Sequence, residues 1–215
     1  MLTQNLGFPR IGANRELKKA CEACWSGKIS LTELEQAGKI ERQKNWEIQQ
    51  RAGIDLVPSN DFSFYDQMAD MAFMLDAIPE RFQPLKGKLA SMDLYFAMCR
   101  GYQKDGLDVT PLEMTKWFDT NYHYLVPEFE KGQTFSLTGT KAIDEYIEAK
   151  KLGIQTKPVL IGPFSFLKLG KEKQSDFNRM ELIHSLLVVY IELIGKLEDA
   201  GANCIQIDEP CLVTD

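Results

Sequence analysis

The sequence predicts an α/β fold built on a parallel sheet. Short apolar segments with strand character alternate with helical segments along the chain, which is the pattern of folds with parallel sheets. The segment 158–163 is almost continuously apolar, as expected for a parallel strand that is covered on both faces. About five main strands are expected, whereas a closed (β/α)₈ barrel needs eight. The chain is therefore either an open five-stranded sheet or a barrel truncated to about five strands.

The helices of the first half are framed by recognisable end signals. Asn14 is a favoured N-cap for a helix over 14–26. Ser30 and Glu33 have the spacing of a capping box, and Gly53 is a suitable end for the helix that they begin. The remaining elements expected in this half are strands over 2–8 and 54–58, and helices over 66–78 and about 88–101.

The second half continues the alternation. The elements expected there are a strand within 114–124, a short strand at 135–138, a helix over 140–152 ending at Gly153, the strand 158–163, a helix over 176–200 and a last strand at 204–210. No linker or shift of composition divides the chain. We therefore expect residues 1–215 to belong to one barrel-type domain.

Polar or aromatic side chains follow each predicted strand. They are Arg10, Asn60, Asp61, Asn121, Tyr122, His123, Ser165, Asp208 and Glu209. In α/β folds the binding site lies at the C-terminal ends of the strands, so these residues are expected to share one face. Asp208 and Glu209 either orient a substrate and act as acid and base, or cap the loop that follows.

Composition excludes several classes of function. The net charge is -6 and no long basic run is present, which argues against nucleic-acid binding. The longest apolar run, 186–191, is too short to span a bilayer, so a soluble, cytoplasmic protein without a membrane partner is expected. Five cysteines, an odd number, indicate reduced thiols and not a disulfide framework.

No metal site and no catalytic residue is predicted within this chain. Cys21 and Cys24 have the spacing of a metal or redox pair, but they fall inside a helix, where core thiols are the better interpretation. His123 is placed to line the face at the strand ends, and His184 is expected to pack within a helix. Two histidines without clustered cysteines do not make a zinc site.

A basic cluster surrounds the start of the first predicted helix. Arg10, Arg15, Lys18 and Lys19 stand against the single acid Glu16. A helix N-terminus already carries positive partial charge, so fixed cations there suit a bound anion such as a phosphate or a carboxylate-rich tail. A solvated basic face is the alternative. Lys116 precedes an aromatic run and would suit a ligand with a ring and a negative charge, or it is a surface lysine.

Four segments together resemble the cobalamin-independent methionine synthase family. They are Leu6–Gly12 with Arg15–Lys19, Gly53–Pro58 with Asp61–Asp66, Met114–Phe118 with Asn121–Tyr124, and Ile205–Pro210. The four occur in order and span essentially the whole chain. The combination is specific, although each segment alone would be a weak signal.

The resemblance implies the N-terminal barrel of an enzyme with two face-to-face (β/α)₈ barrels. Such enzymes transfer a methyl group from 5-methyltetrahydrofolate polyglutamate to homocysteine, giving methionine, without cobalamin. A zinc ion activates the homocysteine thiol, and its ligands belong to a C-terminal barrel that this chain does not contain. The chain would then be part of a methyltransferase of methionine biosynthesis and would be inactive alone.

The resemblance also assigns the residues that bind 5-methyltetrahydropteroyltriglutamate. They are Arg15, Glu16, Leu17, Lys18 and Lys116. Asn14 departs from many members, which have a basic residue there. Two other readings stay open: a complete, non-catalytic open-sheet α/β binding module, and an independent methyltransferase or decarboxylase of barrel type. Unpaired strand edges of a truncated barrel predict self-association of the isolated chain.

Overall fold

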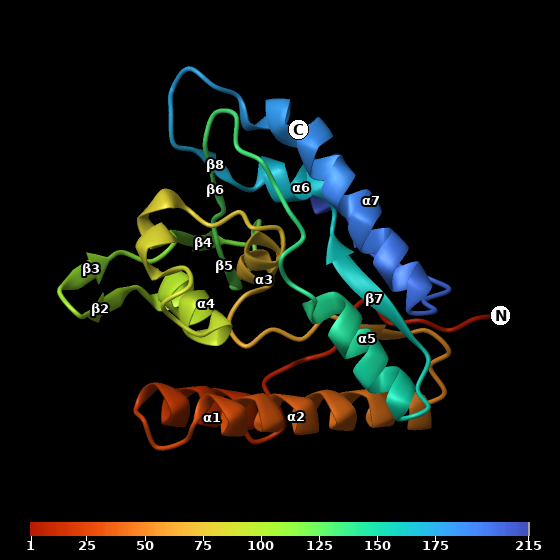
Figure 1. Cartoon of the computed structure of the whole chain (residues 1–215). Coiled ribbons are helices and arrows are strands. Elements are labelled where there is room, and N and C mark those ends of the chain that lie inside the picture. Colours follow the sequence, from red (N-terminus) through yellow and green to blue (C-terminus); the bar gives the residue numbers. More distant parts are fainter. Residues whose placement is uncertain (215) are drawn as a thin grey trace. The chain divides into compact units, whose positions relative to one another are not determined.

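The computed structural model describes residues 1–214 (Figure 1), which form two compact units. The first unit comprises Met1–Phe64, Lys141–Leu160 and Leu197–Gln206. The second comprises Tyr65–Thr140, Ile161–Lys196 and the residues from Ile207 onward. Each unit is therefore built from segments that are distant in the sequence. No helix in the described residues is long and apolar enough to cross a membrane.

The main sheet has three strands in the order β1-β7-β9. Their bounds are Val57–Ser59 for β1, Thr156–Ile161 for β7 and Gln206–Asp208 for β9. β1 and β7 are parallel, with Val57 opposite Thr156, and all six residues of β7 are buried. The predicted class, α/β with a parallel sheet, is confirmed. The expected count of about five strands was wrong, because the other strands form separate two-stranded pairs, and the described residues form no closed barrel.

The helices of the first unit pack around an aromatic centre. They are α1 (Glu16–Trp25), α2 (Leu31–Arg51) and α5 (Lys141–Lys151), and α1 folds back alongside α2 (Figure 1). The capping box of Ser30 and Glu33 is present as predicted, and Gly53 follows α2 with a φ of 79°. Buried Trp46 packs with Val57, Ala149 and Ile154, and its indole N–H donates to the Pro58 carbonyl at 3.1 Å.

The N-terminal segment is not the strand expected over 2–8. Within it, Gln4 forms an isolated parallel bridge with Leu56. Carboxylates take up nearby backbone donors: the Thr3 N–H donates to Asp55 and the Phe8 N–H to Asp61, both at 2.7 Å. These side-chain acceptors replace the ladder partners that a strand would need.

The second unit holds most of the remaining elements. Its helices are α3 (Gln67–Met74), α4 (Ser91–Arg100), α6 (Pro163–Lys168), most of α7 (Ile183–Asp199), and the 3₁₀ turns η1 (Glu80–Leu85), η2 (Arg179–Leu182) and η3 (Pro210–Val213). Its antiparallel hairpins are β2 (Tyr102–Lys104) with β3 (Leu107–Val109), and β4 (Met114–Lys116) with β5 (His123–Leu125). β6 (Glu128–Phe129) pairs in parallel with β8 (Lys171–Glu172). Edge-to-face contact between Phe129 and Phe166, with centroids 5.5 Å apart, lies in its core.

Two expected elements of the second unit differ from the prediction. The strand expected within 114–124 is a hairpin of two short strands. The strand expected at 135–138 is absent, because Ser136 and Thr138 donate their N–H groups to the Leu75 and Met74 carbonyls at the end of α3. An extended segment therefore satisfies orphan carbonyls of a helix end, where a sheet partner was expected.

Candidate functional site

The start of α1 has an unusual backbone. Arg15 is the N-cap residue, with φ 63° and ψ 38° in the left-handed region, and its side chain makes no capping bond. Asn14 is therefore not the N-cap, contrary to the prediction. Its side-chain amide donates to the Glu16 carboxylate at 3.2 Å, where a capping residue would accept from the first turn.

Glu16 folds back onto the turn before the helix. Its carboxylate accepts the Asn14 N–H at 2.8 Å. The pKa of Glu16 is lowered, chiefly by its own backbone N–H and then by that of Asn14. Gly12 has a φ of 82°, and a Cβ there would lie 2.3 Å from Oε2 of Glu16 and 2.9 Å from Oε2 of Glu41. Glycine is therefore needed for the carboxylates to approach this turn.

The other residues at this helix start have different exposures. Leu17 is 1 % exposed and its N–H donates to the Ile11 carbonyl at 3.2 Å, so it anchors the helix to the preceding turn. Lys18 is exposed and forms a loose pair with Glu22 at 3.6 Å. Arg15 is exposed and forms no ion pair among residues 1–214. Arg15, Lys18 and Lys19 are thus exposed cations that an anion from solvent can reach.

The left-handed backbone of Arg15 predicts a measurable strain. We expect Arg15→Gly to raise the free energy of unfolding by about 1 kcal/mol, because glycine adopts this conformation without a Cβ clash. Arg15→Ala removes the same charge but keeps the Cβ, and it should leave stability within about 0.5 kcal/mol of the parent. Urea titration of both variants separates the two effects. Equal stability of the glycine and alanine variants would show that the backbone is not strained.

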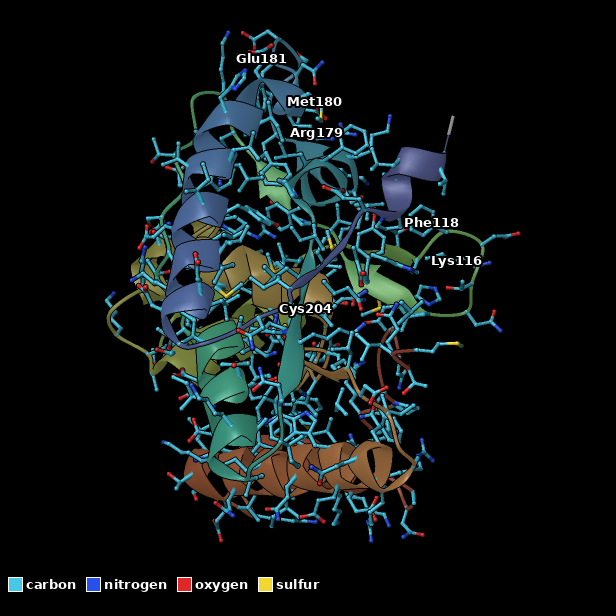
Figure 2. All side chains as sticks on the ribbon, turned by 90° about the vertical axis from the view of Figure 1, so that its right-hand side faces the viewer. Lys116, Phe118, Arg179, Met180, Glu181 and Cys204 are labelled. Carbon is cyan, nitrogen blue, oxygen red and sulfur yellow. The ribbon has the colours of Figure 1, made fainter. Side chains whose placement is uncertain are left out.

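Lys116 lies in the second unit, at the end of β4. Its cross-strand partner is His123, its side chain is exposed, and it forms no ion pair within the described residues. Trp117 and Phe118 follow, with ring centroids 5.2 Å apart, and Phe118 has a φ of 50°. Figure 2 labels Lys116 and Phe118 on this hairpin. Four of the five predicted binding residues are thus adjacent in the first unit, and Lys116 belongs to the second.

The polar residues after the strands have structural partners within their own units. The Glu209 carboxylate accepts the N–H groups of Phe164 and Ser165, at 3.0 and 2.7 Å, at the start of α6. In the first unit, the Asn60 N–H donates to buried Glu145 at 3.1 Å. Glu209 therefore has a structural role, although it caps the start of α6, earlier in the chain, and not the loop that follows it as predicted.

The thiols and imidazoles are only partly where the sequence predicted them. Cys21 is buried, and its thiol lies 3.6 Å from the Phe64 carbonyl, as a core thiol should. His184 is exposed, so the expected packing role was wrong. His123 is also exposed, and its Nδ1 lies 3.1 Å from the Asn121 carbonyl. Across residues 1–214 no three His, Cys, Asp or Glu side chains are placed to hold a metal ion.

Asp66 was missed as a site residue. It is 2 % exposed and caps α3 by accepting the N–H groups of Met68 and Ala69. Burial raises its pKa to about 6, against the lowering effect of donors that include the Ala69 N–H. An aspartate directly before an apolar helix is an N-cap signal, and it could have been read from the sequence. Its additional bonds to distant residues could not.

Comparison with known proteins identifies the family. Residues 2–215 match the family model described as "Cobalamin-independent synthase, N-terminal domain". A protein of Cytophaga hutchinsonii named 5-methyltetrahydropteroyltriglutamate–homocysteine methyltransferase is 60% identical over 218 residues, covering 100% of this chain and 28% of its own length. The protein of the same name from Saccharomyces cerevisiae is 52% identical over 218 residues, covering 98% of this chain and 28% of its own length.

A solved structure agrees in fold. It is described as a B12-independent methionine synthase from a Shewanella species in complex with selenomethionine. The TM-score is 0.56 at 20% sequence identity, over 85% of this chain and 44% of that chain. The chain spans 28% of the length of the curated relatives that it matches. Because the family model matches residues 2–215, the chain belongs to the cobalamin-independent synthase family and corresponds to its N-terminal domain.

Proposed function

We propose that this chain is the N-terminal part of a cobalamin-independent methionine synthase. We further propose that its role in the enzyme is to bind the polyglutamate tail of the folate substrate. The enzyme as a whole would transfer a methyl group from 5-methyltetrahydropteroyltriglutamate to homocysteine. The names of relatives that are 60% and 52% identical support this assignment. Arg15, Lys18 and Lys116 would bind the tail, and Glu16 and Leu17 would hold the turn.

The observations that carry this proposal are the exposure and the backbone conformation of Arg15. It is exposed, has no ion-pair partner within residues 1–214, and is held in a left-handed backbone at a helix N-terminus. Backbone strain of this kind costs of order 1–3 kcal/mol and persists where the surroundings, often at a functional site, impose it. Each glutamyl unit of the tail adds a carboxylate, and guanidinium and ammonium groups bind carboxylates through charge-assisted hydrogen bonds.

The remaining parts of the proposal concern the whole enzyme. The three-stranded sheet would be part of a (β/α)₈ barrel that faces a C-terminal barrel. Zinc would activate the homocysteine thiol in that C-terminal barrel. We propose that the methyl-transfer step takes place at that zinc and that the isolated chain is inactive. A cytoplasmic location suits an enzyme of methionine biosynthesis.

Binding of triglutamylated 5-methyltetrahydrofolate tests the proposal. We expect Arg15→Ala, Lys18→Ala and Lys116→Ala each to weaken binding about fivefold at low ionic strength, since an exposed ion pair contributes up to about 1 kcal/mol. The losses should shrink as salt is added, because the charges are exposed. Isothermal titration calorimetry of the chain against the triglutamate and the monoglutamate gives the tail contribution directly.

Matched controls are available for two of these variants. Lys28 is exposed beyond the end of α1, and Lys104 is exposed on the other hairpin of the second unit. Lys28→Ala and Lys104→Ala should leave the affinity unchanged if binding is local to the proposed residues. Equal affinity for monoglutamate and triglutamate, or equal losses in all five variants, would contradict tail binding at this site.

A further inference from the structure

The Asp66 carboxylate does more than cap a helix. Its Oδ1 accepts the N–H groups of Met68 and Ala69, at 3.0 and 2.9 Å, which is the ordinary capping arrangement. The same oxygen accepts the Leu125 N–H of β5 at 3.2 Å, and Oδ2 accepts the Tyr122 hydroxyl at 2.9 Å. Two of its four bonds therefore hold the β4–β5 hairpin, which carries Lys116.

A short chain of contacts leads from Tyr122 to Lys116. The Tyr122 carbonyl accepts the Trp117 N–H at 2.7 Å, and Trp117 directly follows Lys116. The Trp117 carbonyl accepts the Thr120 N–H at 3.2 Å and its hydroxyl at 2.6 Å. The Trp117 ring also meets buried Tyr124 edge-on, with centroids 5.5 Å apart. The end of the hairpin is thus tied to the core next to the lysine.

The other hairpin of this unit provides a natural comparison. In the β2–β3 hairpin the Tyr102 hydroxyl also donates to an aspartate, Asp105, at 2.8 Å. That bond lies within the exposed turn itself, between residues three apart, and its carboxylate is not a helix cap. The same pair of groups therefore closes a turn in one hairpin and anchors the other hairpin to α3.

We propose that Tyr122 and Asp66 are positioning residues that fix the β4–β5 hairpin, and with it the Lys116 ammonium, for binding the folate tail. The proposal rests on the proposed function of Lys116. A lysine side chain has several rotatable bonds, so the place of its ammonium group depends on how firmly its backbone is held. Anchoring the hairpin in the free protein lowers the conformational entropy that the hairpin itself would otherwise lose when the tail binds.

The test is Tyr122→Phe in the full chain, which removes one hydroxyl and keeps the ring. Binding of triglutamylated 5-methyltetrahydrofolate should weaken about threefold, as for the loss of one hydrogen bond. In combination with Lys116→Ala the loss should be smaller than the product of the single losses, whereas with Arg15→Ala the losses should multiply. Tyr102→Phe should leave affinity unchanged. The Trp117 amide should exchange with solvent faster in Tyr122→Phe than in Tyr102→Phe.

The outcomes separate this proposal from the one on which it depends. If Lys116→Ala binds as tightly as the parent, Lys116 does not contact the tail and the positioning role fails with it, whereas tail binding by Arg15 and Lys18 is decided by their own variants. If Lys116→Ala weakens binding but Tyr122→Phe does not, only the positioning role is wrong. Losses that multiply for Tyr122→Phe and Lys116→Ala would likewise overturn it, because the two residues would then act independently.

Discussion

Replacing Arg42 by methionine should lower the free energy of unfolding by about 3–5 kcal/mol, the usual cost of breaking a buried ion pair from one side. The Arg42 side chain is 8% exposed and contacts the Glu148 carboxylate through two nitrogens, at 3.2 and 2.8 Å. Its guanidinium also lies 3.8 Å from Glu145 and 5.0 Å from the centre of the Phe62 ring. Removing the guanidinium leaves the Glu148 carboxylate without its bidentate partner.

A second variant distinguishes a broken ion pair from lost packing. Replacing Arg42 by methionine and Glu148 by leucine together should recover part of the loss, because an apolar pair has no charge to desolvate. Lys131→Met is the surface control: its pair with Asp176 is 57% and 71% exposed, and its loss should change stability by less than about 1 kcal/mol. Urea unfolding followed by tryptophan fluorescence measures all three. A loss below about 1 kcal/mol for Arg42→Met would show that the ion pair is not needed.

Local signals in the sequence predicted the helices better than the strands. Ser30 and Glu33 defined the start of α2 because a capping box uses groups three residues apart. β7 was recognised from the apolar run 158–163, which includes four of its six buried residues, whereas the polar and also buried Thr156 and Lys157 fell outside the predicted strand. The segment 2–8 was misjudged because Asp55 and Asp61, distant in sequence, supply acceptors for its N–H groups. Pairing partners that depend on tertiary structure leave no local signature.

In the candidate site, too, some features have a local signal in the sequence and others depend on tertiary contacts. The charge pattern around Arg15 and Lys18 was visible in the sequence, and so was the basic residue at Lys116. The left-handed conformation of Arg15 was not, since it is imposed by the contacts of Gly12 and Glu16 at the preceding turn. Residue type favours Asn14 as the N-cap, but in the structure its side-chain amide donates to the Glu16 carboxylate. The charge pattern thus indicated a candidate anion site, the family resemblance supplied its residues, and neighbouring side chains determine its geometry.

Asp66 should make the stability of the chain fall as pH rises. Its pKa in the folded state is raised to about 6 by burial, with smaller contributions from neighbours that include Asp70. The unfolded state ionises near the ordinary value of 3.8, so between these two values the folded state binds more protons. Stability associated with this group is complete below about pH 4 and is lost as pH rises through about 6. A shift of this size corresponds to about 3 kcal/mol.

Asp66→Asn isolates this effect, because its carbonyl oxygen can replace Oδ1 as acceptor for Met68, Ala69 and Leu125. The variant should gain about 3 kcal/mol relative to the parent between pH 4 and pH 7, measured as the difference of two urea titrations at each pH. Taking the difference removes the titration of all other carboxylates. A pH-independent difference for Asp66→Asn would mean that the buried carboxylate keeps an ordinary pKa, with its four donors offsetting the cost of burial.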